Sequence, residues 1–93
     1  MSKPIRLKAT IVNQRGLHAR AAAKFVKLAD SFDATVIVER NGSAVDGRSI
    51  MGLMMLAAGP GSELEMSATG NEAQAALAAL CDLIGRGFDE GPA

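Results

Sequence analysis

The only histidine of this 93-residue sequence, His18, lies in the segment GLHARAAA (residues 16–23), at the predicted start of a helix. A helix N-terminus presents unpaired backbone N–H groups and the positive end of the helix dipole. Both favour a bound phosphoryl group and disfavour a protonated imidazole ring. Arg20 follows two residues later, and its planar guanidinium suits phosphate oxygens. The residue types and spacing therefore predict a site that holds a phosphoryl group on a neutral, nucleophilic His18.

Each of these residues also has a simpler interpretation. A histidine at this place can serve only as a helix cap or a core residue, and a surface arginine is often just a solvated charge. The glycine before His18 and the arginine after it together favour phosphate chemistry over either interpretation.

The first half of the chain predicts the elements around this segment. Residues 5–11 alternate between apolar and polar, which indicates a strand with one face in the core. Residues 19–29 change to a helical period, with Ala22, Phe25, Val26 and Ala29 on one face and Lys24 and Lys27 directed outward. Residues 34–39 indicate a second strand, and an Asn-Gly turn at 41–42 predicts a hairpin into a short third strand at 43–45.

The second half continues this alternation of elements. Residues 49–56 form a compact apolar run that Ser49 can cap as a short helix, and Gly59-Pro60-Gly61 ends it. Residues 62–68 alternate again and predict a fourth strand. A longer helix follows, capped either by a box from Thr69 to Glu72 or by Asn71, and ended by Gly85 or Gly87. Its predicted core face consists of Ala73, Ala76, Leu77, Leu80, Leu83 and Ile84.

The element order βαββαβα predicts an α+β fold. Strands with one polar face suit a four-stranded antiparallel sheet, with three helices covering the other face in a two-layer open-faced sandwich. We expect one domain over residues 1–93, with an ordered core at about 4–87 and a loose tail at 88–93.

Composition excludes several classes of protein. Ten basic and ten acidic residues balance, and three phenylalanines are the only aromatic residues, so a nucleic-acid stacking surface is not expected. Cys81 stands alone, so no internal disulfide is possible, and its alanine- and leucine-rich surroundings predict a packing role. No secretory segment or apolar run of membrane-spanning length is present, which predicts a cytoplasmic protein without membrane insertion. We expect no metal site and no bound cofactor.

Two segments resemble one known family. GLHARAAA (residues 16–23) resembles the active-site motif of HPr, the histidine phosphocarrier of the phosphoenolpyruvate-dependent phosphotransferase system. RSIMGLMML (residues 48–56) resembles the regulatory-serine motif of the same family, and the element order over residues 4 to about 87 matches the HPr fold.

The resemblance implies a carrier that is not an enzyme in the usual sense. His18 would accept a phosphoryl group on Nδ1 from phosphorylated enzyme I and pass it to an enzyme IIA-type domain, while Arg20 and the backbone of Ala19 and Ala21 support the phosphate. The family commonly has proline where this chain has Ala21, which removes a backbone restraint but adds an N–H group near the phosphate. We expect a modest effect on transfer and a monomeric carrier.

The second motif implies regulation and docking. By resemblance, HPr kinase/phosphorylase would phosphorylate Ser49, although a plain N-cap role needs no regulation. A short helix cannot bury every side, so Leu53 and either Leu56 or Ile50 should face the sheet. The rest of the apolar run would then form an adaptable docking patch, assisted by Lys24 and Lys27 if these are more than solvated charges. The docking candidates are Ile50, Met51, Met54, Met55, Lys24 and Lys27.

The sequence leaves three alternative functions open. The carrier could belong to the sugar-transport branch or to a nitrogen-related regulatory branch, and the sequence does not separate them. A non-catalytic regulatory module on the same fold would be expected to lack the histidine. A small nucleic-acid binder is disfavoured by the zero net charge.

Overall fold

The alternating segments form one antiparallel sheet, with strands in the order β1-β4-β2-β3. The computed structural model describes residues 3–90. The strands are β1 (Ile5–Thr10), β2 (Thr35–Arg40), β3 (Ser43–Asp46) and β4 (Glu63–Thr69), and the helices are α1 (Ala19–Asp30), α2 (Ile50–Met55) and α3 (Ala73–Gly85). These bounds follow the predicted order and confirm the predicted α+β fold.

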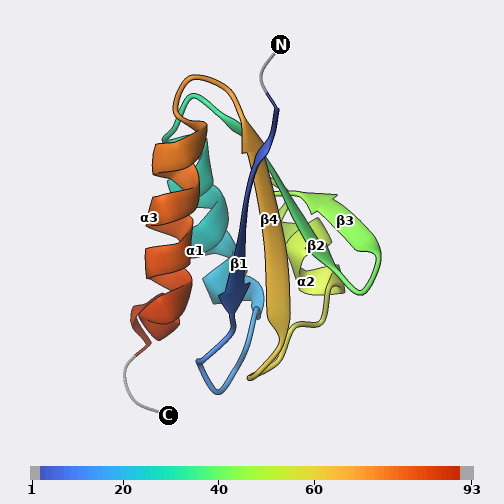
Figure 1. Ribbon diagram of the computed structural model, residues 1–93. Coiled ribbons are helices and arrows are strands. Elements are labelled where there is room, and N and C mark those ends of the chain that lie inside the picture. The colour runs from blue at the N-terminus through green and yellow to red at the C-terminus, as the bar shows by residue number, and fades with distance from the viewer. Residues whose placement is uncertain (1–2, 91–93) are drawn as a thin grey trace.

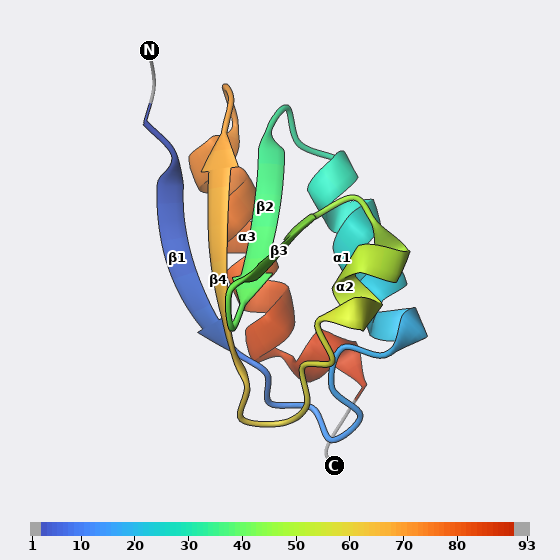
Figure 2. The ribbon, with the colours of Figure 1, turned by 90° about the vertical axis from the view of Figure 1, so that its right-hand side faces the viewer.

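The helices lie in a second layer against the sheet. Figure 1 shows α1 and α3 along one face of the sheet, and Figure 2 shows α2 beside α1 near β3. The core lies between the layers, where Val38, Leu64 and Met66 meet Phe25 and Leu80, all completely buried. All six residues predicted for the core face of α3 are buried. Because β1 is an edge strand, its Ile5 and Leu7 stay partly exposed.

Turn chemistry explains how the hairpin forms. Asn41 and Gly42 have φ values of 52° and 84°, the left-handed conformations that a tight two-residue hairpin turn requires. The hairpin predicted from the Asn-Gly pair is therefore present between β2 and β3.

The start of α3 differs from the predicted capping box. Glu72 is itself the N-cap residue and makes no side-chain capping bond. Its Oε1 instead accepts the backbone N–H of Asp33 at 2.7 Å, and the Asn71 amide donates to the Asp33 carboxylate at 2.9 Å. These two side chains bind Asp33 in the loop before β2 and so connect the start of α3 to that loop. They bond this loop in place of the first N–H groups of the helix.

The expectation of a loose tail at 88–93 is wrong for residues 88–90. Phe88 is completely buried, a short 3-10 turn covers Gly87–Asp89, and Glu90 contacts residues near the start of α1. Residues 91–93 lie outside the described part of the chain.

Candidate functional site at the start of helix α1

His18 occupies the N-cap position of α1, as the sequence predicts. Its backbone is extended (φ −78°, ψ 179°), and its carbonyl accepts the N–H of Ala22 at 2.8 Å, the first bond of the helix. The N–H groups of Ala19, Arg20 and Ala21 point out of the first turn without helical acceptors. The imidazole ring is therefore attached at the end of the helix, where a phosphate could accept hydrogen bonds from these N–H groups.

A close approach between two loops sets the direction of the chain before His18. Gly16 has a φ of 65°, and the N–H of Leu17 donates to the carbonyl of Ala58 at 2.9 Å. A Cβ atom on Gly16 would lie 2.4 Å from the same carbonyl oxygen, so only glycine fits. The loop after α2 thus supports the loop that carries His18.

The ring of His18 is mostly covered. Its side chain is 20% exposed because the Glu90 carboxylate lies against its Nε2 atom. The other Glu90 oxygen accepts the Asn13 amide at 2.9 Å, and the same amide nitrogen donates to the Gly16 carbonyl at 2.8 Å. Polar contacts thus join Asn13 to Glu90 and Glu90 to His18.

Electrostatics keep Glu90 ionised. Burial raises its pKa, but hydrogen bonds from Asn13 and His18 and the charge of Arg15 lower it, and the net pKa lies below the ordinary value of 4.5. The carboxylate therefore faces Nε2 as an acceptor at neutral pH.

The other predicted site residues do not all gather at His18. Arg20 is exposed in the first turn of α1, two residues after His18. The Lys24 amine donates to the carbonyl of Phe88 at 2.6 Å and so holds the segment after α3. Lys27 is exposed in the last turn of α1. The sequence does not predict that Asn13 and Glu90 lie here, because no local pattern marks either residue.

The second motif forms the predicted short helix. Ser49 is the N-cap of α2, and its Oγ accepts the N–H of Gly52 at 2.9 Å. Leu53 and Leu56 are buried, so of the two alternatives Leu56, not Ile50, faces the core. The exposed apolar patch of α2 consists of Ile50, Met51, Met54 and Met55, with Met51 and Met55 at 70% and 79% exposure. This α2 patch lies on the element next to α1 (Figure 2).

Two other properties bear on the chemistry. Among residues 3–90, no three His, Cys, Asp or Glu side chains gather as a group that could hold a metal ion. Within the same range, none of the helices has the length and apolar character needed to cross a membrane.

Comparison with known proteins agrees with this geometry. The family model described as "PTS HPr component phosphorylation site" matches residues 5–86. A phosphocarrier protein HPr from Pseudomonas aeruginosa is 54% identical over 86 residues, covering 91% of this chain and 96% of that protein. A phosphocarrier protein NPr from Shewanella violacea is 42% identical over 81 residues, covering 87% and 89%. The crystal structure of an HPr from Thermoanaerobacter tengcongensis superimposes with a TM-score of 0.90 at 39% identity, covering 95% of this chain and 99% of that one. The chain therefore belongs to the HPr family, the phosphocarrier proteins of the phosphotransferase system.

Proposed function

We propose that His18 accepts a phosphoryl group on Nδ1 from phosphorylated enzyme I and passes it to an enzyme IIA-type domain. The observation that carries this proposal is the position of His18 as N-cap of α1, with Nε2 held by Glu90 and the ring's other nitrogen left as the acceptor. Arg20 and the N–H groups of Ala19 and Ala21 would neutralise charge on the phosphate during transfer. The relay proceeds in the cytoplasm.

Docking would use the α2 patch together with the positive charges of α1. The exposed methionines offer a surface that can adapt to several partners. Lys27 and Arg20 are exposed, and Lys24 lies between them along the same helix, so an acidic partner surface would be attracted to the His18 side.

Phosphorylation of Ser49 would regulate this docking. The hydroxyl lies at the start of α2, beside the α2 patch, so an added phosphate would place negative charge where a partner's acidic surface approaches. HPr kinase/phosphorylase is the proposed modifying enzyme. Treatment with that kinase and ATP should add one acid-stable phosphate to the chain and none to Ser49→Ala.

The first experiment is phosphorylation with phosphoenolpyruvate and enzyme I, followed by mass spectrometry. The chain should gain one acid-labile phosphate, and His18→Ala should gain none. A chain that stays unmodified with an enzyme I that phosphorylates another HPr would contradict the relay.

A nitrogen-regulatory carrier is the second candidate, because a relative named phosphocarrier protein NPr is 42% identical. Transfer rates from the sugar-branch enzyme I and from its nitrogen-branch counterpart separate the two. Faster transfer from the nitrogen-branch donor would favour this candidate.

A further inference from the structure

The segment directly after α3 has an unusual backbone conformation. Gly87, Phe88 and Asp89 have φ values of 65°, 57° and 59°, three consecutive residues in the left-handed region. This conformation costs roughly 1–2 kcal/mol for each residue other than glycine. Such strain persists only where surrounding contacts determine the conformation.

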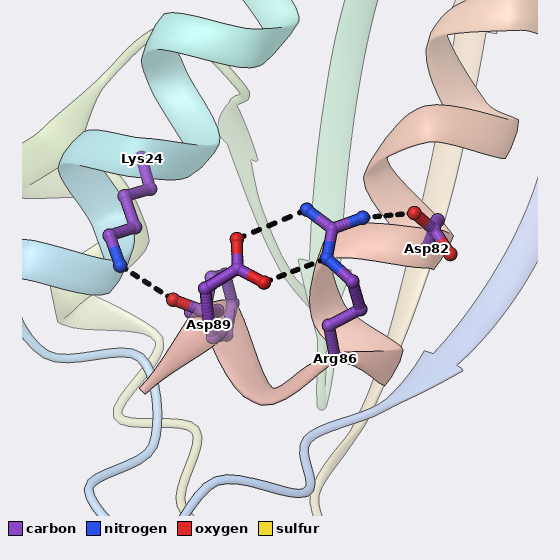
Figure 3. Close-up of polar contacts among 5 residues, drawn as sticks. Lys24, Asp82, Arg86 and Asp89 are labelled. Atoms are coloured by element: carbon purple, nitrogen blue, oxygen red, sulfur yellow. Dashed lines mark hydrogen bonds and ion pairs between the residues drawn. The ribbon is translucent and has the colours of Figure 1, made fainter. Parts of the chain in front are cut away.

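Two anchors hold the C-terminal strap, residues 86–90, against the fold, and exposed ion pairs of Arg86 add to them. The Phe88 side chain is completely buried, and the Phe88 carbonyl accepts the Lys24 amine from α1. Arg86 holds Asp89 with two bonds, from Nε at 2.8 Å and from Nη2 at 3.2 Å, and also pairs with Asp82 of α3. Figure 3 shows these contacts bridging the end of α3 and the first half of α1. The strap thus follows directly from α3 and is held against α1 by the Lys24 contact.

The strap delivers one carboxylate to the working histidine. Oε2 of Glu90 contacts Nε2 of His18, and Oε1 is held by the amide of Asn13, which is itself only 4% exposed. Both the histidine and the glutamate side chains are mostly covered, at 20% and 17% exposure. Glu90 lies beyond residues 5–86, the span that the family model matches.

A neutral imidazole carries its one proton on either nitrogen, and its partner decides which. An ionised carboxylate can only accept, so Nε2 facing it carries the proton and Nδ1 keeps its lone pair. We propose that Glu90 is a positioning residue for phosphoryl transfer: it holds the Nε2 proton of His18 and so presents Nδ1 to the phosphorus. This inference rests on the proposed relay function.

The charge balance of the transfer step adds a second role for the same contact. The Nδ1 lone pair forms the new N–P bond, while the electron pair of the breaking P–N bond returns to the donor histidine. The ring of His18 keeps its Nε2 proton and therefore gains positive charge as the bond forms. The Glu90 carboxylate lies beside that nitrogen and stabilises the charge. When the phosphoryl group leaves for the next acceptor, the N–P electron pair returns to Nδ1 and the ring loses this charge.

The first test needs no phosphate at all. The ¹⁵N chemical shifts of the His18 ring report which nitrogen carries the proton in the neutral form. The wild-type ring should be almost entirely the Nε2–H form, whereas Glu90→Ala should show an increased share of the Nδ1–H form. The matched control is Glu39→Gln on β2, on the strand face opposite the helices, where the ring should match the wild type.

The second test measures phosphoryl acceptance from enzyme I under single-turnover conditions. At metal sites, removing a carboxylate that orients a histidine ligand typically costs roughly ten- to a hundredfold in metal affinity or activity, and the orienting contact at His18 has the same geometry. We expect Glu90→Ala and Glu90→Gln to slow acceptance by roughly tenfold, with unfolding midpoints reported for each variant and Glu39→Gln unchanged.

The outcomes separate the two proposals. A slower rate with an unchanged tautomer would show that Glu90 only braces the fold, and an altered tautomer with an unchanged rate would show that orientation does not matter to transfer; either result overturns the positioning role. If the wild type itself accepts no phosphoryl group, the relay function fails, while the tautomer measurement still reports the Glu90 contact independently.

Discussion

At the scale of single residues, Gly16, two residues before His18, is required by packing. Gly16 combines a left-handed backbone with a position directly against Ala58, where a Cβ atom would lie 2.4 Å from the carbonyl oxygen. Gly42 is also left-handed, but a Cβ atom there would meet nothing within 4 Å. A comparison of substitutions at the two glycines therefore separates the cost of backbone strain from the cost of steric overlap.

Gly16→Ala should destabilise the protein more than Gly42→Ala. Both replacements incur about 1–2 kcal/mol of backbone strain, and only Gly16→Ala adds an overlap that must move the Ala58 loop. The free energy of unfolding in urea measures the difference. Equal losses in the two variants would contradict the tight loop contact at Gly16.

Glu90 should give the stability of the protein a specific pH dependence. Its folded pKa lies below the ordinary 4.5, so its contribution is present above that value and is lost as the pH falls through the lower folded pKa. The difference in unfolding free energy between the wild type and Glu90→Gln should be largest near neutral pH and should disappear in acid. Repeating the comparison in a His18→Ala background separates the contribution of Asn13 and Arg15 from that of the histidine. A difference that grows toward pH 3 would refute this assignment.

At the scale of elements, α2 depends on its first residue. A helix of six residues is too short to be stable by itself, so its cap and its packing must hold it. Ser49 supplies the cap, and Gly52 leaves room for it, because a Cβ atom on Gly52 would lie 3.0 Å from the Ser49 hydroxyl. The proposed regulatory serine is therefore already a structural residue.

Ser49→Ala should lower the free energy of unfolding by about 1 kcal/mol, the usual value of an N-cap bond. Ser43→Ala on the exposed short strand β3 is the matched control and should change stability little. Ser49→Asp should keep most of the stability, because aspartate also caps helices, while adding negative charge beside the α2 patch. An unchanged stability in Ser49→Ala would show that packing of Leu53 alone holds α2.

At the scale of the whole molecule, the two faces of the sheet differ. The helical side carries His18 and the α2 patch, while the open side carries cross-strand ion pairs of Arg6 with Glu65 and Lys8 with Glu63, at 3.6 and 3.8 Å. These pairs are well exposed, so each contributes little to stability. We infer that partners approach from the helical side.

Met54→Ala should raise the KM for enzyme I by roughly fivefold while leaving stability nearly unchanged, because an exposed docking side chain contributes mainly to binding. Ile37→Ala is the matched control: Ile37 is 36% exposed on the open face and Met54 is 40% exposed on α2. Steady-state transfer assays with both variants measure the effect. Equal KM values for the two variants would argue against docking through the α2 patch.

The sequence by itself determined the elements and the place of the candidate site. Alternation and helical period predict the four strands and three helices in order, because burial on one face of each element is a local property of side-chain spacing. His18, Arg20 and Ser49 could be found for the same reason: each lies at a helix start that a few neighbouring residues define.

Only the tertiary structure decided what surrounds that site. Glu90 meets His18 across 72 residues, the Lys24 amine meets Phe88 across 64, and Asn71 meets Asp33 across 38. Such contacts leave no periodic trace, because each depends on one side chain and on the path of a distant segment. The left-handed turn at 87–89 likewise exists because the buried Phe88 side chain and the Lys24 contact hold it, so a segment that the sequence predicts as a loose tail lies at the candidate site.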